Sequence, residues 1–168
     1  MSNKPFLYNV IFTYGSLQSV GHVSEYFIAH TRKLIVYIVM PRVQHTHNIL
    51  RIYMEGSLVK ESKVYSSGNF ILYYLSWLYH HWKFLLMYLR RNDRAIVFVS
   101  HPIALFGMTI QRMVRNVTFA YWIGDYYPPV NFSLICFERL KKYYHDHVPI
   151  VFYLSDRINR ILNNGKIV

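Results

Sequence analysis

The sequence predicts an α/β protein with a mostly parallel sheet covered on both faces. Short apolar runs rich in Val, Ile, Tyr and Phe are bounded by Gly, Pro and polar clusters, as in buried strands. These runs alternate with segments of helical spacing, a pattern typical of parallel sheets. Hydrophobic residues make up 53% of the chain, and no internal repeat or linker divides it. We therefore expect a single domain over residues 1–168.

The first part of the chain predicts two strands joined by a helix, followed by a hairpin. The first strand is bounded by Pro5 and Gly15, and the second stops at Pro41. The hairpin should turn at Glu55-Gly56. The expected elements are a strand from Leu7 to Thr13, a helix from His22 to Thr31, a strand from Lys33 to Met40, and hairpin strands from Ile49 to Glu55 and from Ser57 to Tyr65.

The second part predicts a further alternation of helices and strands. The expected elements are a long helix from Asn69 to Arg91, a strand from Ala95 to Ser100, a helix from Ile103 to Arg115, a strand from Val117 to Ile123, a helix-like segment ending at Cys136 to Tyr144, a strand from Ile150 to Leu154 and a terminal helix from Arg157 to Asn164. Because βαβ connections place successive strands side by side, the strands starting near Leu7, Lys33, Ala95, Val117 and Ile150 should share one parallel sheet.

The long helix is unusually aromatic and would be about 34 Å long. Its first half carries no charge, but His80, His81 and Lys83 in its middle argue against a membrane span. We expect one face to pack on the sheet and the other to enter a membrane interface, or a partner domain to bury it instead. The predicted membrane-surface residues are Trp77, Trp82, Lys83, Arg90, Arg91 and Arg94.

The charge balance predicts an anionic partner. Nineteen Lys and Arg face eight Asp and Glu, a net charge of +11 with His neutral. A membrane surface, a nucleic acid or a phosphorylated substrate would suit this excess, as would a merely solvated basic face.

The single cysteine, Cys136, excludes a disulfide or a cysteine zinc site within one chain and favours a reducing cytosol. The N-terminus shows no signal-peptide pattern, so we expect a cytoplasmic protein, peripheral at the inner or cytosolic membrane face.

Three loops that follow predicted strands carry the candidate site residues. In open α/β sheets, ligands bind at the carboxyl ends of the strands. Gly21 would let backbone N–H groups approach an anion, or would only ease a turn. His101 would touch substrate or simply start a helix, and Asp125 would orient a hydroxyl, act as a base or stabilise its own turn. We expect Gly21, His101 and Asp125 to cluster at one edge of the sheet.

These loops resemble motifs of glycosyltransferases built from two Rossmann-like domains, the GT-B architecture. Residues 19–26 resemble the family's G-G-V-G-x-H-V-x-E-L loop, with Ser19 in place of one glycine. Residues 124–128 resemble its H-D-x-x-P segment, with Gly124 where histidine is common. Glu138 and Ser155-Asp156 resemble a later acidic motif, although residues 147–149 depart from its usual Ala-Asp.

The resemblance implies a Rossmann-like three-layer α/β/α fold, one half of a GT-B enzyme. It implies the acceptor-binding half of a retaining, metal-independent transferase that moves a sugar from a nucleotide-sugar to a hydroxyl acceptor. The chain would bind no cofactor itself; the nucleotide-sugar would belong to a donor-binding C-terminal half, which residues 1–168 lack and which would be supplied in cis or in trans. The implied roles are catalytic for Asp125 and His101, and substrate-binding for Ser19, Gly21, His22, Gly124 and Tyr126.

Two other function classes stay open at this point. One is a non-catalytic membrane-surface or scaffold protein of the same fold, and the other is a basic nucleic-acid-binding module. The nucleic-acid hypothesis is weak, because only Gln111, Arg112, Arg115 and Asn116 suggest a recognition helix. A dinucleotide G-x-G-x-x-G motif is absent, and no metal site is predicted.

Overall fold

The computed structural model describes residues 7–16, 25–40, 47–99 and 102–123, together with 139, 143, 146, 147 and 150–153. Residues 25–30 are helical. The other elements are the strands β1 Tyr8–Ser16, β2 Thr31–Val39, β3 His47–Met54, β4 Ser57–Tyr65, β5 Ala95–Val99, β6 Val117–Ile123 and β7 Ile150–Tyr153, the α-helices α2 Phe70–Tyr88 and α3 Met108–Val114, and the 3₁₀ helix η1 Pro102–Leu105. The predicted terminal helix, residues 157–164, and most of the helix-like segment before β7 lie outside the described residues.

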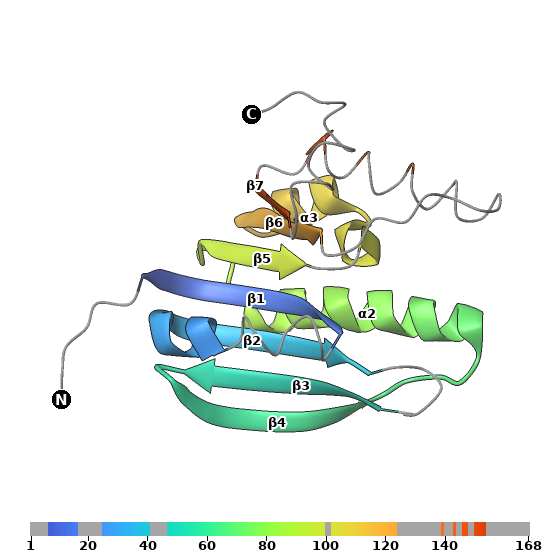
Figure 1. Ribbon diagram of the computed structural model, residues 1–168, viewed down its shortest axis with the longest axis horizontal. Coiled ribbons are helices and arrows are strands. Elements are labelled where there is room, and N and C mark those ends of the chain that lie inside the picture. The colour runs from blue at the N-terminus through green and yellow to red at the C-terminus, as the bar shows by residue number, and fades with distance from the viewer. Residues whose placement is uncertain are drawn as a thin grey trace.

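The strands form one seven-stranded sheet in the order β4-β3-β2-β1-β5-β6-β7 (Figure 1). The run from β2 through β1, β5 and β6 to β7 is parallel throughout. Only the hairpin is antiparallel, with β3 pairing with β2 and β4 with β3. The predicted α/β class with a mostly parallel sheet is therefore confirmed, as is the sharing of one parallel sheet by the five strands named above.

Apolar side chains are buried on both faces of the sheet, since alternate residues of its inner strands point to opposite sides and each side is covered. On one side, Phe12, Tyr37 and Phe119 pack with residues of α2, η1 and α3. On the other, Ile11, Leu34 and Phe98 pack around Phe27 of the helical residues 25–30. Central strands buried on both faces need near-continuous apolar sequence, which explains the runs seen in β2 and β5.

The β3–β4 hairpin turns at the predicted dipeptide. Glu55 and Gly56 have φ angles of 51° and 87°. Two successive positive φ values define the tight turn whose twist matches that of the flanking strands. The outer strand β4 is exposed and carries charges that protect an edge from pairing with other chains. Its Glu61 accepts a 2.7 Å hydrogen bond from the Nε of Arg51, the residue directly opposite on β3.

Helix α2 begins one residue after the predicted start, with Asn69 as its N-cap, and ends three residues before the predicted end. The Asn69 side chain caps the start by accepting hydrogen bonds from the backbone N–H groups of Ile71 and Leu72, at 3.0 and 3.2 Å. At the far end Leu89 is extended, and the Asp93 carboxylate binds the backbone N–H of Arg90 at 2.8 Å. This side-chain bond closes a turn in place of another helical turn, so Arg90 and Arg91 are not helical.

Two cations from other elements bind the carboxyl end of α2. The Lys33 ammonium on β2 donates to the carbonyl of Tyr88. The Arg115 guanidinium, just after α3, donates to the carbonyls of Leu89 and Leu86, at 2.9 and 3.0 Å. The last turn of α2 contains no basic residue of its own. Lys33 and Arg115 therefore satisfy its terminal carbonyls and its negative dipole end.

The predicted helix from Ile103 to Arg115 is wrong as a single element. The structure divides it into η1 and α3 at Phe106-Gly107. Gly107 has a φ of 71°, in the left-handed region that ends a right-handed helix. A Cβ at Gly107 would lie 2.9 Å from Cζ2 of Trp82, so glycine also permits the close approach of this turn to α2.

Candidate functional site

The carboxyl ends of β1, β5 and β6 meet at one edge of the sheet. The parallel registers pair Tyr14 of β1 with Val99 of β5, and Val99 with Tyr121 of β6. From β1 the chain moves outward to β2, β3 and β4, then returns through α2 to β5 on the other side of β1. The strand order therefore reverses between β1 and β5. Such a switch point is where open α/β sheets bind ligands.

All the predicted substrate and catalytic residues follow these three strand ends. β1, β5 and β6 end at Ser16, Val99 and Ile123. The residues themselves lie outside the described part of the chain: Ser19, Gly21 and His22 after β1, His101 after β5, and Gly124, Asp125 and Tyr126 after β6. The strand ends that carry them share one edge, while their own convergence stays a prediction.

A buried hydrogen-bond network supports the segment after β5. The Gln111 side-chain amide donates to the carbonyls of Ala104 and Phe106, at 3.2 and 2.9 Å. Its oxygen lies 3.0 Å from Nε2 of His81 on α2. Gln111 and His81 are both fully buried. The network ties η1 and α3 to α2, and so fixes the residues that immediately follow the position of His101.

The hydrogen bonds of Gln111 define the state of His81. Both amide hydrogens of Gln111 point to carbonyls, so its oxygen accepts a hydrogen bond from Nε2–H of His81. Nε2 therefore carries a hydrogen, and the imidazole is neutral near pH 7 because its pKa is low. Burial lowers the pKa of His81 to about 4, and the hydrogen bond to Gln111 offsets only part of this effect. From the sequence, His81 was only a polar residue inside an aromatic helix, and its partner lies thirty positions away.

A second buried network supports the carboxyl end of β2. Asn48 donates to the Tyr37 hydroxyl at 3.0 Å and accepts from the backbone N–H of Met40 at 3.1 Å. The Tyr73 hydroxyl on α2 donates to the carbonyl of Met40 at 3.1 Å. Burial raises the pKa of Tyr37 well above its ordinary value, so its hydroxyl stays protonated. Sequence reasoning missed this network; its one local signal is an asparagine at a buried strand position.

The prediction that Trp77 lies at the membrane surface is wrong. Trp77 is 4% exposed and lies on the stripe of α2 that faces the sheet, with Tyr73, His81 and Phe84. This stripe has the helical spacing of a core-facing surface. Trp82 is half-buried against Gly107, whereas Lys83, Arg90, Arg91 and Arg94 are exposed.

The opposite side of α2 carries exposed apolar residues that continue onto α3. Trp82 contacts the turn at Gly107, and Arg115 after α3 binds the carbonyl of Leu86, so the two helices lie side by side. We call this surface the α2–α3 apolar face. It comprises Leu75, Trp82, Leu86, Phe106, Ile110 and Met113. Lys83 on α2, Arg112 on α3 and Arg91 just after α2 are exposed next to it in the sequence.

In the described part of the chain, no group of three His, Cys, Asp or Glu side chains could hold a metal ion. Among the described helices, none has the length and apolar character needed to cross a bilayer.

No protein-family model, curated protein or solved structure matches this chain.

Proposed function

We propose that this chain is a Rossmann-like, acceptor-binding half of a GT-B glycosyltransferase, with its site at the carboxyl edge of β1, β5 and β6. The observation that carries the proposal is the reversal of strand order between β1 and β5. The three loops with family-like motifs all leave the sheet at this edge. The two buried networks support its flanks, after β2 and after β5.

In this proposal the acceptor sugar or lipid-linked sugar lies over the carboxyl edge. His101 contacts the acceptor, and Asp125 orients its hydroxyl or removes its proton as a general base. Ser19, Gly21 and His22 provide the loop after β1, and Gly124 and Tyr126 flank Asp125. A separate donor-binding half, in cis or in trans, would hold the nucleotide-sugar. Electrostatic stabilisation of an oxocarbenium-like transition state requires both halves.

The experiment is ligand-observed saturation-transfer NMR on the chain alone. The probes are methyl glucoside, methyl galactoside and octyl glucoside, with UDP-glucose as the donor probe. The chain should bind at least one glycoside, because acceptor recognition lies on this half. The chain should not contact the glucose of UDP-glucose, and it should transfer no glucose to the glycosides.

A membrane-surface role is the second candidate, and the α2–α3 apolar face is the observation that favours it. A helix with an apolar solvent side and flanking cations is suited to an anionic bilayer surface. The net charge of +11 adds long-range attraction to such a surface. This role is compatible with a lipid-linked acceptor, and we propose the cytosolic membrane face as its location.

Vesicle sedimentation tests the membrane role. Met113 is 80% exposed, so Met113→Glu should leave the fold intact while placing a carboxylate in the apolar face. We expect wild type to sediment with phosphatidylserine vesicles at low salt, and Met113→Glu to bind at least tenfold more weakly, since a charge is added and apolar contact is lost. Val59→Glu, at an exposed position of β4, is the matched control and should bind like wild type. The role would be contradicted if wild type bound neutral and phosphatidylserine vesicles equally well, or if Met113→Glu and Val59→Glu lost vesicle binding to the same extent.

A further inference from the structure

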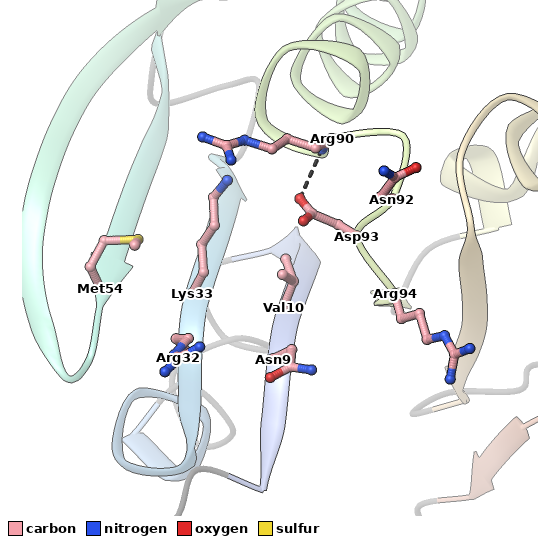
Figure 2. A pocket seen from close by; sticks show the side chains of 9 residues that line it. All are labelled: Asn9, Val10, Arg32, Lys33, Met54, Arg90, Asn92, Asp93 and Arg94. Atoms are coloured by element: carbon pink, nitrogen blue, oxygen red, sulfur yellow. Dashed lines mark hydrogen bonds between the residues drawn. The ribbon is translucent and has the colours of Figure 1, made fainter.

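The amino edge of the sheet contains a basic pocket of 510 Å³ (Figure 2). It opens beside the starts of β1, β2 and β5, at the edge opposite the proposed acceptor site. The loop between α2 and β5 forms one wall, and the hairpin contributes Met54. Its lining residues are Asn9, Val10, Arg32, Lys33, Met54, Arg90, Asn92, Asp93 and Arg94.

Four cations and a single carboxylate line this pocket. The carboxylate of Asp93 is engaged by the backbone N–H of Arg90 at 2.8 Å. Arg32 reaches Glu55 only at 3.6 Å, and both side chains are about 60% exposed, so water weakens this pair. Within the described residues, the guanidinium groups of Arg90 and Arg94 have no acidic partner. The pocket therefore has uncompensated positive charge.

Figure 2 shows the Arg90 side chain extending over β2 toward Lys33, while Arg94 lies on the far side of β1. Lys33 already serves the carboxyl end of α2 through the carbonyl of Tyr88. Its charge thus offsets the negative end of the helix dipole, which would otherwise repel an anion here. The Arg90 guanidinium remains available as a planar fork of donors, the group best suited to bind phosphate oxygens in pairs.

We propose that this pocket binds a phosphate-bearing small molecule with more than one anionic group. One phosphate lies between Arg90 and Lys33, and the molecule extends toward Arg94. The side-chain amides of Asn9 and Asn92 provide neutral hydrogen-bond partners. The volume is in the range of about 300–1,000 Å³ found for small-molecule sites and exceeds what a single phosphate fills. The assignment is independent of the acceptor site, because it uses the opposite edge and none of its residues.

Calorimetric titration of the chain with inorganic tripolyphosphate, in a buffer of fixed ionic strength, tests this assignment. Tripolyphosphate should bind at a single site and more tightly than inorganic phosphate. Arg90→Ala should weaken binding by about tenfold or more, since charged hydrogen bonds are lost, and Arg94→Ala should weaken it less. Arg90→Lys keeps the charge but loses the fork, so its affinity should fall between those of wild type and Arg90→Ala.

Arg91→Ala is the matched control. Arg91 is exposed on the same loop but does not line the pocket, so its loss should leave the affinity unchanged. Equal weakening by Arg91→Ala and Arg90→Ala, or equal binding of phosphate and tripolyphosphate, would overturn the assignment. Phosphatidylinositol bisphosphate vesicles distinguish the source of the phosphate. If these vesicles compete with tripolyphosphate, and Met113→Glu weakens binding to the vesicles but not to tripolyphosphate, the natural ligand is a lipid headgroup. If the vesicles do not compete, the natural ligand is a soluble phosphate compound.

Discussion

Gly107→Ala should destabilise the fold by about 3 kcal/mol. The left-handed backbone costs a non-glycine residue about 1–2 kcal/mol, and an overpacked contact adds about 1–3 kcal/mol. The contact is specific, because the new Cβ would lie 2.9 Å from Cζ2 of Trp82. The free energy of unfolding, measured by urea denaturation monitored by circular dichroism, gives the effect directly.

Two other glycines make a matched series for this measurement. Gly56 has a φ of 87° but its nearest neighbour to a new Cβ is at 3.8 Å, so Gly56→Ala should cost only the backbone strain. Gly68 has open space around it, so Gly68→Ala should be close to neutral. In a Trp82→Leu background, the cost of Gly107→Ala should fall toward that of Gly56→Ala. Equal costs at all three glycines would contradict the described turn.

His81 should make the protein sensitive to mild acid. Its pKa is about 4 in the folded protein, against an ordinary value of about 6.5 in the unfolded chain. As the pH falls below about 6.5, the unfolded chain takes up the proton first, and stability falls by about 1.4 kcal/mol per pH unit. The fall from this residue continues to about pH 4, where the folded form is protonated too, and it totals roughly 3 kcal/mol.

The variant His81→Gln isolates this contribution. Glutamine can still donate to Gln111 but carries no titrating group. It should lower stability at pH 7 and lose less between pH 6.5 and pH 4.5 than wild type does. The control His47→Gln removes an imidazole at the exposed start of β3, and its curve should follow that of wild type. If His81→Gln and wild type lose stability in parallel, His81 is not the buried neutral imidazole described here.

Much of the fold follows from local patterns in the sequence. The parallel strands are apolar runs between clear breakers, and β6 covers the predicted residues Val117–Ile123. The hairpin turn lies at the predicted dipeptide Glu55-Gly56, because this tight turn needs positive φ angles and glycine adopts them readily. These features depend on neighbours in the chain, so the sequence alone specifies them.

The remaining features depend on contacts between distant residues. The partners of the last carbonyls of α2 are Lys33 and Arg115, which lie outside this helix. The break at Gly107 reflects the approach of Trp82, which a single glycine in a helical pattern does not reveal. Trp77 was misplaced because α2 is apolar on nearly all sides, so its periodicity does not show which side faces the sheet.

The edge at which the strands before the predicted site residues end was predictable, while the site itself stays a prediction. Parallel strands bring their carboxyl ends together wherever they occur, so β1, β5 and β6 had to present their following loops at one edge. How Ser19, His101 and Asp125 face one another depends on loop conformation, which periodicity does not encode. The basic pocket at the amino edge was not predicted, because its cations come from β2 and from the loop after α2.

Saturation-transfer NMR with glycosides, extended to site variants, tests the central claim most directly. Asp125→Asn and His101→Ala should each abolish most of the signal from the bound glycoside, because both residues follow strands that end at the carboxyl edge. Asn92→Ala, at the amino edge, is the matched control and should retain the wild-type signal. We expect the wild type and Asn92→Ala to bind the same glycoside, and both carboxyl-edge variants to lose that binding. A glycoside signal that survives in Asp125→Asn and His101→Ala, or no signal with any of the three glycosides, would contradict an acceptor site at this edge.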